Sequence, residues 1–212
     1  MVDQGTVLAV CRVHALLADQ GSGVTAIDKR PVTGPVKVQP YGLFADVQAD
    51  RKNHGGLHKA VYAYSQSDAD FWAVQLGREV PPGLFGENLR LSGVEANSAL
   101  IGEQWQLGAK AVVEVTMPRT PCSVFQRRMA EPQWVKRFTE AARVGAYLRV
   151  LQTGSIQQGD EVRVIHRPSH SVTVRDWFSA PSIAKMQALQ NEPGLELAPE
   201  YQPYFEKLLR RN

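Results

Sequence analysis

The chain has 212 residues, of which 43% are hydrophobic and 21% are charged, a composition typical of soluble globular proteins. This composition excludes a disordered protein. No apolar run approaches the roughly 20 residues that a membrane-spanning helix requires, so we expect no membrane association. The N-terminus carries an acidic residue and no basic residue before its first apolar stretch, so we expect no secretory signal.

The net charge is +3, and no run of basic residues is longer than two. Tracts that bind nucleic acid typically have five to eight basic residues in a row, so a nucleic-acid polymer is not the expected partner. The two cysteines, Cys11 and Cys122, lie far apart, and no Cys-x-x-Cys occurs. A zinc site is therefore not expected, a disulfide stays open, and the expected compartment is the reducing cytoplasm.

Short strands separated by Gly, Pro and Asp dominate the first three quarters of the chain. Many short strands with few helices between them favour a closed β-barrel over a sheet of alternating strands and helices. The predicted fold class is therefore mainly β with some α. The predicted strands cover residues 6–13, 24–27, 36–39, 60–64, 88–91, 104–107, 110–117, 147–151 and 161–165.

Two helices are predicted within the barrel sequence. The first has Ser67 as its N-cap and ends before Gly77. The second covers residues 134–142, where Trp134 and Phe138 recur at helical spacing. We interpret both helices as caps on the barrel rather than as functional motifs.

The chain becomes helical after residue 168, with predicted helices at 174–178, 183–190 and 201–209. We predict two domains, a barrel at 1–168 and a helical C-terminal unit at 169–212. The second is too short to hold a large core of its own. It should therefore pack either on the barrel or on a second copy of the chain in a homodimer.

The first candidate for chemistry is Cys122 in Pro118-Arg119-Thr120-Pro121-Cys122. Two prolines make this turn stiff, so its side chains are held in place. The thiolate is both the nucleophile and the soft-metal ligand, and a neighbouring Arg119 favours the charged form. The alternative is that Cys122 is a small buried apolar residue, as free cysteines often are.

The second candidate is His54-Gly55-Gly56 followed by Lys59. Paired glycines let backbone N–H groups approach a ligand, and Lys59 can meet a phosphate or carboxylate. The alternative is a tight turn into the next strand. A metal pair of His54 and His58 is disfavoured, because the glycines between them argue against the helix that such a pair needs.

Two further candidates lie at predicted strands. Asn88 follows a Gly-rich loop that includes Glu87, and the alternative is a turn in which Asn88 caps its own backbone. Alternation along the strand at 147–151 places Tyr147 and Arg149 on one face. In the mouth of a barrel Arg149 would bind an anion, whereas on the outside it would be solvated.

Together these motifs resemble the MOSC domain, named for the C-terminal part of molybdenum-cofactor sulfurases. The resemblance covers essentially the whole chain and is closest to the bacterial N-hydroxylaminopurine resistance proteins, which add a three-helix region after the barrel. The motifs, in order, are Gly42-Leu43-Phe44-Ala45-Asp46, His54-Gly55-Gly56 with Lys59-Ala60-Val61-Tyr62, Phe85-Gly86-Glu87-Asn88-Leu89, Pro118-Arg119-Thr120-Pro121-Cys122 and Gly145-Ala146-Tyr147-Leu148-Arg149.

The resemblance implies a PK β-barrel-like fold that binds the molybdenum cofactor (Mo-molybdopterin). It implies that Cys122 is the metal ligand, in agreement with the soft-ligand chemistry of a thiolate, with Arg119 beside it. The implied activity is reduction of a small N-hydroxylated base or amine to the parent amine, with electrons from an external reductase. Candidate cofactor-binding residues are His54, Gly55, Gly56, Lys59, Asn88, Tyr147 and Arg149, and Asp46 would orient a neighbour.

Two positions depart from the pattern of that family. Ala45 stands where a second glycine is usual, so a left-handed backbone there would strain the alanine. Met117 replaces a polar residue before the Pro-Arg pair, which would alter the pocket and hence the substrate.

Two other hypotheses remain beside the reductase. The chain could be a module that carries the cofactor, or a sulfur atom on Cys122, to a partner enzyme without turnover of its own. The third, a nucleic-acid binder, is the least favoured. Binding without turnover would distinguish a carrier from a reductase, and a steep salt dependence of DNA binding would reveal the third.

Overall fold

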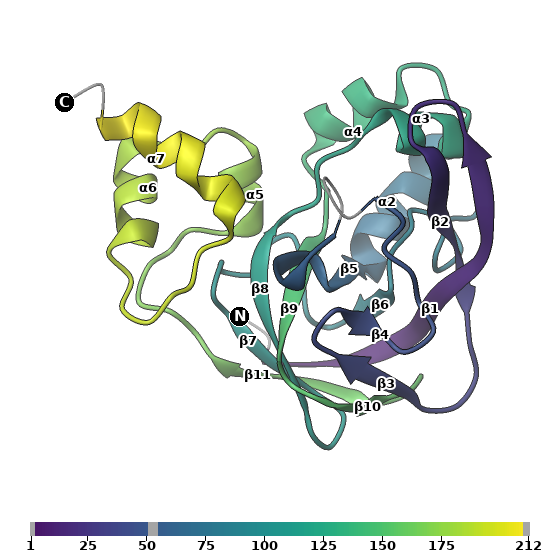
Figure 1. The fold of residues 1–212 in the computed structure, drawn as a ribbon, viewed down its shortest axis with the longest axis horizontal. Helices are drawn as coiled ribbons and strands as arrows, with labels where there is room; N and C mark the ends of the chain where they lie inside the picture. The colour runs from purple at the N-terminus through teal and green to yellow at the C-terminus, as the bar shows by residue number, and fades with distance from the viewer. Residues whose placement is uncertain (1–2, 51–54, 210–212) are drawn as a thin grey trace.

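Seven strands close into a mixed β-barrel in the computed structural model, which describes residues 3–50 and 55–209 (Figure 1). The closed barrel predicted from the sequence is confirmed, because the last strand of the barrel pairs with the first. The order around the barrel is β11 (Glu161–His166), β7 (Gln104–Leu107), β8 (Ala111–Pro118), β9 (Ala146–Gln152), β5 (Val61–Ser65), β6 (Leu89–Ser92) and β1 (Gln4–Asp19).

One pair of barrel strands is parallel, β5 with β6, and the other pairs are antiparallel. A parallel pair needs a long crossover between its strands, usually a helix. Helix α2 (Gln66–Leu76) supplies that crossover. It brings Asn88, which directly precedes β6, next to β5, where the Asn88 backbone N–H donates to the Tyr62 carbonyl at 2.8 Å.

Further strands pair outside the barrel. Strand β2 (Gly23–Pro31) pairs with the long β1, and β10 (Gly154–Ile156), β3 (Val36–Gln39) and β4 (Gly42–Leu43) form a small separate sheet. Strands β4 and β10 were absent from the sequence prediction. They have two and three residues, which is too short for any periodicity to be read.

The first predicted helix starts earlier than its sequence suggests. Ser65 is its N-cap rather than Ser67, so that prediction was wrong. Strand β5 runs directly into α2, and the Ser65 hydroxyl accepts a hydrogen bond from the backbone N–H of Ala96 at 2.8 Å. Ser67 instead donates to Glu95 at 2.5 Å. The helix ends at Gly77 in the left-handed conformation, as expected.

Aromatic side chains hold α2 against two helices, α3 (Ser123–Met129) and α4 (Trp134–Ala141). The rings of Trp72 and Trp134 lie 4.6 Å apart, and those of Phe125 and Phe138 lie 5.0 Å apart. The prediction of α4 is confirmed. Helix α3 was missed because it follows directly on the Pro-rich turn, and its N-cap is Cys122.

The C-terminal part contains α5 (Val174–Phe178), α6 (Ile183–Gln190), the 3-10 turn η2 (Pro199–Tyr201) and α7 (Gln202–Leu209). It packs on the barrel: the buried Tyr201 hydroxyl donates to the Thr116 carbonyl of β8 at 2.6 Å, and the Trp177 ring lies 4.3 Å from that of Tyr201. The division of the chain into two domains at residue 168 stays a prediction. In the described ranges, none of the helices has the length and apolarity needed to cross a membrane.

Candidate functional site

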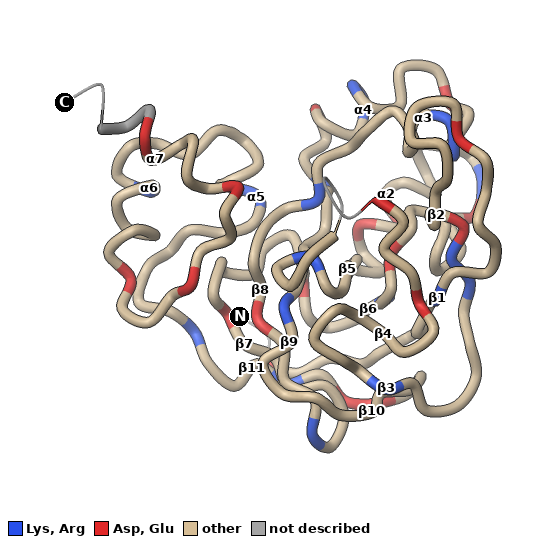
Figure 2. The backbone as a smooth tube through the Cα atoms, in the orientation of Figure 1, with Lys and Arg blue, Asp and Glu red and all other residues tan. Residues whose placement is uncertain are grey.

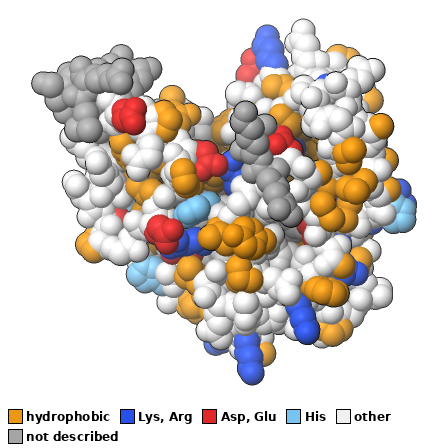
Figure 3. All heavy atoms as spheres, viewed as in Figure 1, with side chains coloured by type: hydrophobic (Ala, Val, Ile, Leu, Met, Phe, Trp, Pro, Cys, Tyr) orange, Lys and Arg blue, Asp and Glu red, His pale blue; other side chains and the backbone are white. Residues whose placement is uncertain are grey.

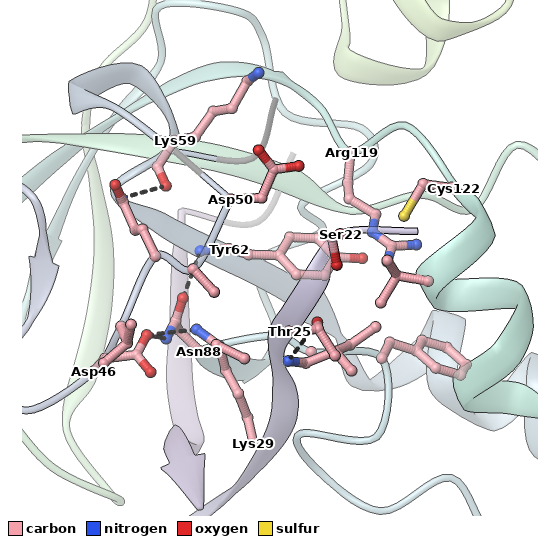
Figure 4. Close-up of a pocket in the computed structure, with 18 of the residues that line it drawn as sticks. Ser22, Thr25, Lys29, Asp46, Asp50, Lys59, Tyr62, Asn88, Arg119 and Cys122 are labelled. Atoms are coloured by element: carbon pink, nitrogen blue, oxygen red, sulfur yellow. Dashed lines mark hydrogen bonds and ion pairs between the residues drawn. The ribbon is translucent and has the colours of Figure 1, made fainter. Parts of the chain in front are cut away.

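A pocket opens between β2, the segment at 46–50 and the turn that leads from β8 into α3 (Figure 4). It combines a thiol, several cationic side chains and an aromatic wall. Six of the residues predicted from the sequence line it, namely Asp46, Lys59, Asn88, Arg119, Cys122 and Tyr147. The fold therefore brings together side chains that are up to 101 positions apart, Asp46 to Tyr147.

The turn at 119–122 carries the reactive side chains. A regular element fixes each end of this turn, because β8 ends at Pro118 and Cys122 is the N-cap residue of α3. Cys122 is partly buried and lines the pocket together with Arg119, and Figure 4 shows their side chains on the same side of it. Cys11 lies in the core, and no disulfide joins the two cysteines.

Arg119 is buried but not saturated with hydrogen bonds. Its guanidinium carbon lies 3.6 Å from the centre of the Phe125 ring, a cation–π contact that positions the group. Among the described residues its Nη1 atom is buried with no hydrogen-bond partner. A buried donor without an acceptor costs about 1–3 kcal/mol. Because Arg119 lines the pocket, this unused bonding capacity lies beside it.

Lys29, Asp46 and Asn88 form a polar cluster on the opposite wall. The Lys29 ammonium donates to Asp46 at 2.5 Å, and the Asn88 amide donates to the same carboxylate at 2.7 Å. Asn88 also bridges two strands, because its Oδ1 accepts from the Tyr62 backbone and its Nδ2 donates to the Cys11 carbonyl. Asp46 thus accepts hydrogen bonds from both side chains, and its role in a cofactor site stays a prediction.

Lys29 was missed in the sequence analysis. The sequence does contain a signal for Lys29. It directly follows the predicted strand at 24–27, and because it is two residues after Ile27, both side chains lie on the same face of the strand. What the sequence lacked was the direction of that face. Only the pairing of β2 with β1 turns Lys29 toward Asp46.

Lys59 and Arg149 meet acidic residues from the C-terminal part. Lys59, at the end of the 3-10 turn η1 (Leu57–Lys59), forms a 2.5 Å ion pair with Glu200. Arg149 pairs with Glu196 and, at 2.9 Å, with Glu114 of β8. Arg149 is not among the residues that line the pocket, and its guanidinium instead contacts Glu114 and Glu196. Figure 2 shows that acidic and basic residues are interspersed along the backbone.

The pKa values near this contact follow from burial and charge. Burial raises the pKa of Glu200, but the hydrogen bond and charge of Lys59 bring it below its usual value. Burial and then the charge of Arg149 lower the pKa of His58, whose ring lies 3.6 Å from Glu196. Near neutral pH Glu200 is therefore an ionised carboxylate and His58 is neutral.

The glycine pair does not face the pocket. The backbone N–H of Gly56 donates to Gln48 at 2.9 Å, and its φ of 97° shows why glycine is needed there. Gly55 is partly buried and is not among the residues that line the pocket. His54, also predicted as a binding residue, lies outside the described residues.

Tyr147 forms the aromatic floor with Tyr62, and their ring centres are 5.4 Å apart. The Tyr62 hydroxyl donates to the Val144 carbonyl at 2.8 Å, so Tyr62 is structural. Burial raises the pKa of Tyr147, and the charge of Arg119 opposes that rise. Tyr147 therefore stays a neutral phenol that can donate a hydrogen bond into the pocket.

Comparison with known proteins decides the family. The family model of the MOSC domain matches residues 50–163, which include four of the five predicted motifs. The chain belongs to the MOSC domain family. This MOSC chain is 30% identical over 176 residues to the uncharacterized protein YflK of Bacillus subtilis, covering 81% of this chain and 79% of YflK.

Two further similarities extend the comparison. The MOSC chain is 33% identical over 155 residues to a protein of Gibberella moniliformis named "Reductase". The aligned region covers 70% of this chain but only 27% of that longer relative. The crystal structure of YiiM from Geobacillus stearothermophilus superposes with a TM-score of 0.78 at 26% identity, over 97% of this chain and 99% of that chain. The similarity to YiiM thus includes the C-terminal helices.

Proposed function

We propose that this protein binds the molybdenum cofactor in the pocket and reduces small N-hydroxylated compounds to amines. The observation that carries the proposal is the pairing of Cys122, a soft ligand on the pocket wall, with Arg119, whose buried Nη1 atom has no partner among the described residues. Membership in the MOSC family and the similarity to a protein named reductase support an oxidoreductase.

The donor set fits a metal that brings most of its own ligands. Among the described residues no group of three His, Cys, Asp or Glu side chains could cage a metal ion. Cys122 would supply a single thiolate, the kind of ligand that soft metals prefer. The dithiolene of a pterin cofactor would supply the others, so the pocket and the cofactor complement each other.

Cationic side chains around Cys122 would hold the anionic end of the cofactor. Lys29 and Lys59 line the pocket with side chains that are mostly buried. Arg119 is the best-placed donor, because stacking on Phe125 fixes its plane. Tyr147 and Asn88 would hydrogen-bond the pterin or the substrate, and the aromatic wall would exclude water.

The reaction in this proposal is a two-electron reduction. An N-hydroxylamine takes up two electrons and two protons, its N–O bond breaks, and the products are an amine and water. When bound, the molybdenum cofactor supplies this two-electron chemistry, and the protein supplies position, charge and exclusion of water. The electrons would come from an external electron-donating reductase. The proposed compartment is the reducing cytoplasm, where Cys122 stays a thiol.

The test is molybdenum content and turnover in protein from a host that makes the cofactor. We expect near-stoichiometric molybdenum in the wild type and none in Cys122→Ala, with circular dichroism confirming the fold. Cys11→Ala is the matched control and should keep its metal, because Cys11 is in the core. Turnover of an N-hydroxylated base with a reconstituted reductase completes the test. Equal metal in wild type and Cys122→Ala refutes the ligand, and metal without turnover indicates a cofactor carrier.

A further inference from the structure

Two carboxylates of the C-terminal part, Glu196 and Glu200, lie against basic side chains of the barrel. Glu196 contacts Arg149 of β9, and its carboxylate lies 3.6 Å from the His58 ring. Glu200 pairs with the Lys59 ammonium at 2.5 Å. Figure 3 shows acidic, basic and histidine side chains together on the face where the C-terminal helices meet the barrel. The two carboxylates thus hold different partners although they are only four positions apart.

Lys59 differs from the other two basic side chains because it also belongs to the pocket. Lys59 lines the pocket, whereas His58 and Arg149 are not among its lining residues. Figure 4 shows the Lys59 side chain extending away from Lys29 and Asn88. A lysine ammonium sits on a flexible four-carbon stem, so it can turn between two anions. The carboxylate of Glu200 therefore sets where the Lys59 ammonium lies in this structure.

The ion pair can open without moving the backbone that carries Glu200. The Glu200 side chain is 46% exposed, so water can solvate its carboxylate when the pair breaks. The next residue is anchored independently, because the Tyr201 hydroxyl donates to the Thr116 carbonyl and the Tyr201 ring lies 4.3 Å from that of Trp177. Breaking the pair therefore moves the Lys59 side chain and leaves the C-terminal helices in place.

An anion in the pocket would attract the same ammonium. Arg119 and Lys29 line the pocket with Lys59, and the buried Nη1 atom of Arg119 has no partner in the part of the chain that the structure describes. An anion beside these groups competes with Glu200 for the charge of Lys59. Two ligands that compete for one group weaken each other equally, so the contact with Glu200 lowers the affinity of the pocket for the anion.

We propose that Glu200 is a positioning residue that sets the affinity of the pocket for anions. It holds the Lys59 ammonium at the C-terminal part until an anion in the pocket displaces it. The inference rests on the proposed function in one respect, since the natural anion would be the phosphate of the cofactor. It also gives the C-terminal part a role at the pocket.

The test is binding of inorganic phosphate to the full chain without cofactor, measured by calorimetry. Glu200→Gln keeps the size of the side chain and removes its charge, so we expect the Kd to fall about five-fold, the modest effect of a pair with an exposed partner. Glu196→Gln is the matched control, because it removes the same charge from a carboxylate that contacts Arg149 instead. At physiological salt, which screens distant charges, we expect the control to change the Kd by less than about two-fold.

A double variant tests whether Glu200 acts through Lys59. Lys59→Gln should raise the Kd for phosphate, and adding Glu200→Gln to it should bring no gain, because the two side chains form one interacting pair. Equal binding by Lys59→Gln and the double variant, including no measurable binding by both, supports the inference. Tighter binding by the double variant overturns it. Circular dichroism shows that each variant is folded.

Two results with the single variants also overturn the inference. The first is the same Kd, or no binding at millimolar phosphate, in both the wild type and Glu200→Gln. The second is an equal gain in Glu196→Gln, which would assign the effect to net charge rather than to the pair with Lys59.

Molybdenum content separates this inference from the proposed function. A wild type that takes up no molybdenum, together with tighter phosphate binding by Glu200→Gln alone, would overturn the proposed function and leave the role of Glu200. A wild type that holds molybdenum and turns over substrate, with phosphate binding indifferent to Glu200, would overturn the role of Glu200 alone.

Discussion

Two regions of the molecule each bury an arginine near a cysteine, and they differ in how many hydrogen-bond partners the guanidinium group has. Arg90 is fully buried and donates to Glu87, to Gln66 and to the carbonyls of Val80 and Pro81. Arg119 is 5% exposed and leaves Nη1 without a partner in the described chain. A saturated guanidinium holds a loop in place, whereas an unsaturated one at a pocket is available to a ligand.

The two cysteines follow the same division. Burial, and then the charge of Glu87, raise the pKa of the Cys11 thiol to about 12. Cys122 stands at a pocket wall and is only partly buried. Residue type alone therefore does not mark the site. What marks it is a polar group whose bonding capacity the fold leaves unused.

The largest expected difference is in thiol reactivity. At pH 8 Cys11 has about three orders of magnitude less thiolate than a cysteine of ordinary pKa, ~8.5. Iodoacetamide should therefore label the native protein once, at Cys122, and mass spectrometry of the digested protein will show the site. Label on Cys11 in folded protein would contradict the comparison, and Cys122→Ala should take up none.

Removing a hydrogen-bond partner of Arg90 should lower the stability of the protein more than any other change considered. Glu87→Gln removes one partner of a fully buried ion pair, 2.5 Å long, and leaves the Arg90 charge uncompensated. We expect a loss of about 3–5 kcal/mol in the free energy of unfolding, measured by urea denaturation. Glu140→Gln is the control, since its pair with Lys136 is exposed, and it should change stability by less than about 0.5 kcal/mol.

Changing the unsaturated arginine should affect binding instead. Arg119→Gln removes cation–π contacts, including the one with Phe125, but also a buried donor that has no partner in the described chain, so we expect the free energy of unfolding to fall by about 1–2 kcal/mol, less than for Glu87→Gln. Cofactor retention should fall about ten-fold or more, the loss of a charged hydrogen bond worth roughly 1.5–3 kcal/mol. Molybdenum content after dialysis measures it, with the exposed Arg163→Gln as control. Retention equal to wild type would place the anion elsewhere.

The smallest expected effect is at Ala45. The sequence predicted strain there if the backbone were left-handed, and its φ is 60°. Ala45→Gly should therefore raise the free energy of unfolding by about 0.5–1 kcal/mol. Thermal denaturation measures this change. A lower free energy of unfolding in Ala45→Gly would contradict the prediction. Ala45 is next to Asp46, which holds Lys29, so an unchanged molybdenum content in Ala45→Gly would show that the backbone strain has no role in cofactor binding.

Much of the secondary structure could be predicted because the pattern of apolar and turn-forming residues along the chain is local. The strands at 36–39 and 104–107 and the helices at 174–178 and 183–190 were predicted with their observed bounds. Errors occurred where long-range pairing decides local structure. Ser65 is the N-cap without a capping hydrogen bond from its side chain, because β5, which pairs with the distant β6 and β9, runs directly into α2.

The sequence by itself determined the fold class, the order of the motifs and the stiff turn that carries Arg119 and Cys122, because these depend on neighbouring residues and backbone preference. Only the tertiary structure decided which cations face the pocket. Lys29 enters it and Arg149 turns toward Glu196 because strand pairing sets the direction of each face. The sequence also left open whether the C-terminal helices pack on the barrel, and contacts such as that of Tyr201 with Thr116, 85 residues away, decided it.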